Sequence, residues 1–226
     1  MRRLFAWLIR WTAILVLAGL TVAAVRTALF PLRDTRGWDA FLGSGAFWVC
    51  ILGLASRVLL TRLRRGDPVE FLDTLEHELT HALAGYLTFA PPVSLTATLR
   101  KGGEVQLTRT NPVVALAPYF LPLFTTAAAA FTLILNPAWM VYGKLAVAFL
   151  LGSFAYRMGR EFHLGQSDFR EFGIVFSLVS IAVILPMALL GVLDMSGILK
   201  IAWHGEIWPV FLNQCKALIN LGFYAR

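Results

Sequence analysis

The stretch Glu76-His77-Glu78-Leu79-Thr80-His81-Ala82-Leu83-Ala84 indicates more about the fold and chemistry of this chain than any other segment. It contains the pattern H-E-x-x-H inside a strongly apolar sequence. His77 and His81 are four residues apart, so a helix places them on one face about one turn apart. Their ring nitrogens can then reach a single zinc ion, and Glu78 beside that face can take a proton from water at the metal. The chain has only 4 histidines, so two at this spacing around a glutamate favour a metal site over coincidence.

The composition indicates a membrane protein. The chain has 226 residues, of which 58% are hydrophobic and 15% charged, whereas a soluble domain is about 45–50% apolar and about 25% charged. The net charge is +7, but most basic residues flank apolar stretches, which is typical of anchoring at membrane edges. We therefore expect an integral, multi-pass protein, with the cell membrane as its location and the lipid bilayer as a partner, and no nucleic-acid partner. The sequence carries no signal for an oligomeric state.

Apolar runs of about 20 residues predict about six membrane helices. Their approximate bounds are residues 4–29, 38–60, 69–89, 112–135, 138–156 and 172–193. The third helix carries the H-E-x-x-H pattern together with Asp73 and Glu76. Ionisable residues at membrane depth avoid lipid and face a bundle interior or a water-filled cavity. Asp73 and Glu76 are therefore either partners of the imidazoles or polar residues close to the water interface.

One segment predicts strands rather than a helix. Residues 93–110 alternate apolar and polar side chains around Gly102-Gly103, the signal of a β-hairpin. The fold class is thus all-α transmembrane, with a small β-hairpin after the motif-bearing helix. We expect two N-terminal membrane helices in residues 1–66, a core in residues 67–195 and an interfacial tail in residues 196–226. Within the core, residues 157–171 read as a polar connection.

A catalytic zinc usually takes three protein ligands and leaves a fourth position for water. The residues that can supply the third ligand are Asp168, Asp194, His163, Glu161, Glu171 and His204. Asp168 is preferred because it stands at the entrance to the sixth predicted helix, where a broken backbone can face a cavity. Its neighbours Gln166 and Ser167 can hydrogen-bond and so orient a carboxylate. Asp194 is the second choice.

The sequence resembles the site-2 proteases, a family of intramembrane zinc metallopeptidases. The resemblance rests on the stretch 76–84 in a membrane helix, the hairpin that follows, and an Asp at the start of a later helix. It covers residues 69–190, about half of the chain. Two positions depart from the family pattern: Thr80 stands where the family usually has Gly before the second His, and Phe169 stands where Gly usually follows the Asp.

The resemblance implies that His77, His81 and Asp168 bind Zn²⁺ and that Glu78 is the general base. The implied reaction is hydrolysis of a peptide bond in or next to a membrane segment, with a membrane protein or peptide as substrate. A helical substrate must unwind to expose its carbonyls, and a strand of the hairpin can hold the unwound segment by β-augmentation.

Two functions of other classes stay open, a catalytically silent membrane scaffold and a metal-handling protein of the same fold. A transporter is expected to carry ionisable residues in several spans, and the predicted helices 112–135 and 172–193 contain no Asp, Glu, His, Lys or Arg. This favours the enzyme over a transporter. A scaffold would tolerate the loss of Glu78, which the enzyme would not.

Overall fold

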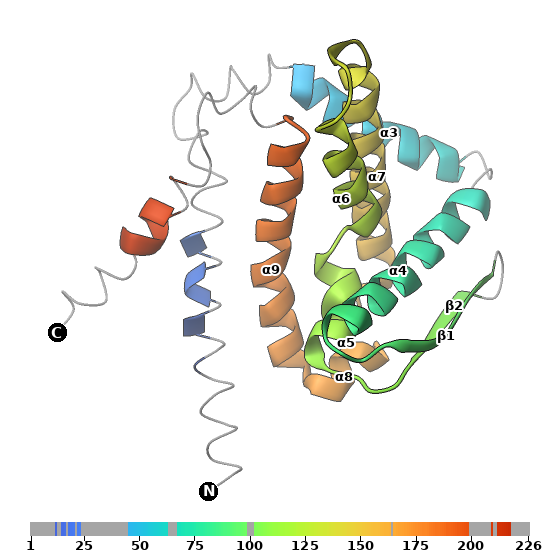
Figure 1. Ribbon diagram of the computed structural model, residues 1–226, viewed down its shortest axis with the longest axis vertical. Coiled ribbons are helices and arrows are strands. Elements are labelled where there is room, and N and C mark those ends of the chain that lie inside the picture. The colour runs from blue at the N-terminus through green and yellow to red at the C-terminus, as the bar shows by residue number, and fades with distance from the viewer. Residues whose placement is uncertain are drawn as a thin grey trace, which may run out of the picture.

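The computed structural model describes residues 12, 15–16, 18–20, 22–23, 45–62, 67–98, 102–163, 165–198, 209 and 212–217. This part of the chain is mostly helical with one small sheet (Figure 1). The helices are α3 (Gly45–Arg62), α4 (Asp67–Leu87), α5 (Pro112–Phe120), α6 (Leu123–Thr132), η2 (Pro137–Trp139), α7 (Met140–Glu161), α8 (Ser167–Phe172) and α9 (Ile174–Met195), and the strands are β1 (Pro92–Thr98) and β2 (Gly102–Leu107). The predicted helical fold with a hairpin after the motif-bearing helix is confirmed at this level.

The described part of the chain contains fewer helices that could cross a membrane than the six expected from the whole sequence. In the described residues, two helices are long and apolar enough, Pro137–Glu161 and Ile174–Met195. Helices α5 and α6 taken together are also long and apolar enough, but the pair is bent by 63° at the break between them. The predicted helix 4–29 and the tail 196–226 lie largely outside the described residues. Two or three apolar helices of spanning length therefore suggest a membrane protein, while six spans are not shown.

Helix α4 ends sharply just before the hairpin. Phe89 adopts a left-handed conformation with φ 57°, and the Ala90 N–H donates to the Gly85 carbonyl at 2.8 Å. This arrangement satisfies carbonyls at the end of the helix. Pro91 and Pro92 follow and cannot continue a helix. The chain therefore turns directly into β1, which pairs antiparallel with β2 beside α4 (Figure 1).

The expectation of one continuous helix over residues 112–135 is wrong. The Asn111 side chain accepts from the Val114 N–H at 3.0 Å and caps α5, with Pro112 in the first turn. The helix stops at Phe120 because Pro122 lacks an N–H and disfavours helical backbone in the residue before it. Leu121 is accordingly extended, with φ −109° and ψ 98°. Helix α6 then starts in a new direction.

The expected polar connection over residues 157–171 is also wrong in part. Helix α7 continues to Glu161, and residues 167–172 form the short helix α8. The sixth predicted helix begins at Ile174 because Gly173, with φ 92°, turns the chain between α8 and α9. Arg157, which the sequence placed in the connection, is 2% exposed inside the bundle.

A cluster of buried apolar side chains joins α5, α8 and α9. It contains Leu116, Tyr119, Phe169 and Ile181, and Phe169 is fully buried. Because Phe169 directly follows Asp168, packing of its ring fixes where α8 presents that aspartate. The apolar core thus determines the position of one predicted metal ligand.

Candidate metal centre

Helix α4 brings the two motif histidines together as the sequence predicted. The Nε2 atoms of His77 and His81 lie 3.2 Å apart. Donor atoms that share a tetrahedral zinc at about 2.0–2.1 Å are about 3.3 Å from each other. The Nδ1 of His81 is 2.8 Å from the carbonyl oxygen of Val114, and a carbonyl only accepts, so Nδ1 carries the proton. The Nε2 lone pair of His81 is therefore available for a metal.

Asp168 is the residue that completes this pair. One ligand atom each from His77, His81 and Asp168 lie within 4.8 Å of one another. Asp168 stands in the first turn of α8, and its Oδ2 accepts a hydrogen bond from the Tyr119 hydroxyl at 2.9 Å. The Tyr119 ring is 1% exposed and packs edge-on against His77, with centroids 5.8 Å apart. Tyr119 therefore contacts two members of the group at once.

Glu78 lies on the same cavity as the three candidate ligands. The cavity has a volume of about 400 Å³, and its lining includes His77, Glu78, His81, Gly103, Glu104, Asp168 and Glu171. The side chain of Glu78 is 9% exposed. Strand β2 approaches it so closely that a Cβ on Gly103 would lie 2.5 Å from Cγ and 2.9 Å from Oε1 of Glu78. The absence of a side chain at Gly103 thus leaves room for this carboxylate.

Two further carboxylates of the motif-bearing helix, those of Asp73 and Glu76, support the helix itself. Asp73 and Glu76 are each 3% exposed, so both are buried inside the bundle. Asp73 forms a buried ion pair with Arg57 of α3. Glu76 pairs with Arg157 of α7 at 3.4 Å. Its other oxygen accepts from the Phe124 N–H of α6 at 2.8 Å, which satisfies a free donor at a helix start.

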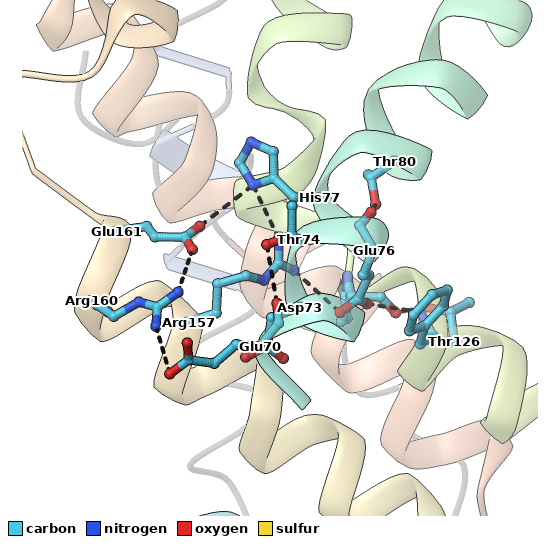
Figure 2. A network of polar contacts seen from close by, with 12 residues as sticks. Glu70, Asp73, Thr74, Glu76, His77, Thr80, Thr126, Arg157, Arg160 and Glu161 are labelled. Atoms are coloured by element: carbon cyan, nitrogen blue, oxygen red, sulfur yellow. Dashed lines mark hydrogen bonds and ion pairs between the residues drawn. The ribbon is translucent and has the colours of Figure 1, made fainter. Parts of the chain in front are cut away.

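The remaining candidates for the third ligand that lie within the described residues do not join the group. Within the described residues, no second set of three metal-ligating side chains comes together, and Asp194 lies at the far end of α9. Glu161 approaches Nδ1 of His77 at 3.6 Å (Figure 2), whereas Nε2 of the same ring faces His81. Glu171 lines the cavity and accepts from the Thr110 hydroxyl. His163 is exposed in the turn between α7 and α8, and His204 lies outside the described residues.

Sequence reasoning missed three residues that hold the site in place. Arg57 and Arg157 each sit in or next to an apolar run, and a charge in such a run is a signal for a buried partner. Tyr119 lies in an apolar helix, and nothing in the sequence around it indicates that its hydroxyl meets Asp168.

Comparison with protein-family models, with curated proteins and with solved structures finds no match to this chain.

Proposed function

We propose that this protein is a membrane-embedded zinc metallopeptidase of the site-2 protease type, which hydrolyses a peptide bond in or next to a membrane segment. The observation that carries the proposal is the meeting of His77, His81 and Asp168 within 4.8 Å, on a cavity that Glu78 also lines. Two imidazoles and a carboxylate are a ligand set that suits Zn²⁺ and leaves one position for water. The 3.2 Å between the two Nε2 atoms fits that ion.

A bound zinc ion would supply a Lewis acid that lowers the pKa of a water molecule and polarises a carbonyl group. The chemistry of this chain's own residues centres on Glu78. Its carboxylate accepts a proton from the attacking water and returns it to the leaving amine. The close backbone at Gly103 restricts the positions open to this carboxylate. Tyr119 orients Asp168, and the Val114 carbonyl orients His81.

Strand β2 offers a place for the substrate. In the described residues it pairs with β1 alone. Gly103, Glu104 and Val105 of β2 line the cavity, opposite the motif-bearing helix. An extended peptide that adds to β2 by β-augmentation would run beside Glu78 and gain main-chain hydrogen bonds. This supports a substrate that is locally unwound.

The test is cleavage by purified protein in detergent or liposomes, supplied with Zn²⁺. The probes are synthetic single-span peptides whose apolar segment contains a helix-breaking Asn-Gly or Gly-Pro pair. We expect cleavage by the wild type and a loss of about 10²–10⁴-fold in Glu78→Gln, because a general base contributes that much. Glu171→Gln is the matched control, since it removes an exposed carboxylate that lines the same cavity from α8 and not from the proposed substrate strand.

Three outcomes contradict the proposal. Equal cleavage by wild type and Glu78→Gln would show that the activity comes from elsewhere. Equal losses in Glu78→Gln and Glu171→Gln would remove the special role of Glu78. Zinc bound to a wild type that cleaves none of these peptides would favour the metal-handling protein or the silent scaffold.

A further inference from the structure

The imidazole of His77 lies between two groups of opposite charge. Its Nδ1 is 3.6 Å from Oε2 of Glu161 and 3.2 Å from a guanidinium nitrogen of Arg157 (Figure 2). Both groups come from the last turns of α7. The two contacts cannot serve the same form of the ring, because a carboxylate only accepts hydrogen bonds and a guanidinium only donates them.

The metal centre requires one particular form of this ring. Nε2 of His77 faces Nε2 of His81, so it is the atom that points to the cation site. A neutral imidazole that binds a metal through Nε2 carries its proton on Nδ1. Arg157 cannot accept a hydrogen bond from that N–H, but the Glu161 carboxylate can. The guanidinium keeps a separate partner in Glu76, whose Oε2 it contacts at 3.4 Å through its other terminal nitrogen.

The two candidate metal histidines are supported in parallel ways. The Nδ1 of His81 faces a fixed acceptor, the Val114 carbonyl at 2.8 Å. Metal-bound histidines almost always give their second N–H to a carbonyl, a carboxylate or water, which fixes the tautomer and the ring orientation. Glu161 is the group in the corresponding place for His77.

The position of Glu161 is itself held by a neighbour. Arg160 contacts Oε1 of Glu161 at 3.3 Å, while Oε2 is the atom that faces His77. Arg160 also reaches Oε1 of Glu70 on α4 at 3.5 Å, so it links the end of α7 to the start of the motif-bearing helix. Glu70 and Glu161 therefore share one arginine, but only Glu161 approaches the imidazole.

We propose that Glu161 is a positioning residue for the metal centre: its carboxylate accepts the Nδ1–H of His77 and so turns Nε2 toward the cation. The inference rests on the proposed metal site but not on peptidase activity. It gives the sequence candidate Glu161 a role beside a ligand instead of a role as the third ligand.

The experiment is a Zn²⁺ affinity measurement on the purified full-length protein, by competition with a chelating indicator dye. We expect Glu161→Ala to weaken Zn²⁺ binding about 10–100-fold, as loss of such a partner typically does. Glu161→Gln should recover part of the affinity, because its amide oxygen still accepts from Nδ1–H. Glu70→Ala is the matched control, since it removes the other carboxylate on Arg160, and its affinity should equal that of the wild type.

Several results would overturn the inference. Wild-type affinity in Glu161→Ala would show that His77 needs no acceptor there. Affinity as weak in Glu161→Gln as in Glu161→Ala would assign the effect to charge, and an equal loss in Glu70→Ala would assign it to the ion-pair network. A wild type that binds no Zn²⁺ would overturn the proposed metal centre and this inference together. A wild type that binds Zn²⁺, with an affinity that Glu161→Ala does not change, would overturn this inference alone.

Discussion

Helices α4 and α9 are almost equal in length, 21 and 22 residues, but the surrounding structure holds them in different ways. Helix α9 is strongly apolar and packs beside α5 and α6, where apolar side chains of these helices form shared clusters. Helix α4 carries its acidic residues and histidines between Asp67 and His81, and it is too polar to count among the helices that could span a membrane. Figure 1 shows α4 crossing the bundle beside the hairpin, while α9 stands along its flank.

The buried polar groups of α4 explain the difference. Asp73 forms an ion pair with a residue of α3. Glu76 forms an ion pair with a residue of α7 and accepts a hydrogen bond from a backbone N–H of α6. His81 donates to the carbonyl of Val114 on α5. Hydrogen bonds and ion pairs are directional, whereas apolar contacts are not. The surroundings of α4 thus fix its rotation as well as its position, which an arrangement of two histidines around one ion requires.

The largest expected effect comes from removing one of these partners. Arg57→Met leaves Asp73 buried without its cation, which should destabilise the protein by about 3–5 kcal/mol. The double variant Arg57→Met/Asp73→Leu removes both charges and should be close to the wild type in stability. Unfolding of the purified proteins in a detergent titration measures both. A double variant as unstable as Arg57→Met would show that apolar volume, and not an unpaired charge, sets the cost.

A smaller effect is expected at Tyr119, which joins the candidate metal site to the apolar cluster shared with α9. Tyr119→Phe removes the hydroxyl that donates to Asp168 and keeps the ring in its apolar cluster. We expect Zn²⁺ affinity to fall about 10–100-fold, as for other partners of metal ligands, with only about 1 kcal/mol lost in stability. Isothermal titration with Zn²⁺ checks this. Unchanged affinity would mean that Asp168 keeps its orientation without Tyr119.

The smallest effect is expected for a substitution in the apolar packing of α9. Ile181 is 4% exposed and packs in the cluster with Tyr119 and Phe169. Ile181→Val should cost about 0.5–1.5 kcal/mol of stability and leave Zn²⁺ affinity unchanged. The same detergent titration and metal titration measure the two quantities. A clear loss of zinc affinity in this variant would show that the metal centre depends on apolar packing as well as on directional pairs.

The contrast between the two helices also explains which parts of the fold and of the metal site could be predicted from the sequence. Local patterns were sufficient for the hairpin and for the spacing of His77 and His81, because both depend on neighbours in sequence. Asp168 was chosen from its place at a helix entrance, and the structure brings it beside the histidines across 87 residues of chain. The break at Pro122 was missed because membrane helices tolerate proline, as α9 does at Pro186, so a proline in an apolar run does not by itself indicate a break.

The supports of α4 were harder to predict because they are contacts between distant segments. Arg157 follows an apolar helix, and its sequence suits a water-exposed helix end equally well. Its burial becomes evident only when Glu76 and His77 of α4 are seen beside it (Figure 2). The hydroxyl of Tyr119 meets Asp168 for the same reason, through the packing of α5 on α8.

The measurement that tests the central claim most directly is the zinc content of the purified protein, compared between Asp168→Ala and Asp194→Ala. Both variants remove one aspartate, the first on α8 at the candidate site and the second at the end of α9. We predict about one zinc per chain in the wild type and in Asp194→Ala, and loss of zinc in Asp168→Ala. Zinc retained in Asp168→Ala, or absent from a wild type prepared with Zn²⁺ throughout, would contradict this prediction.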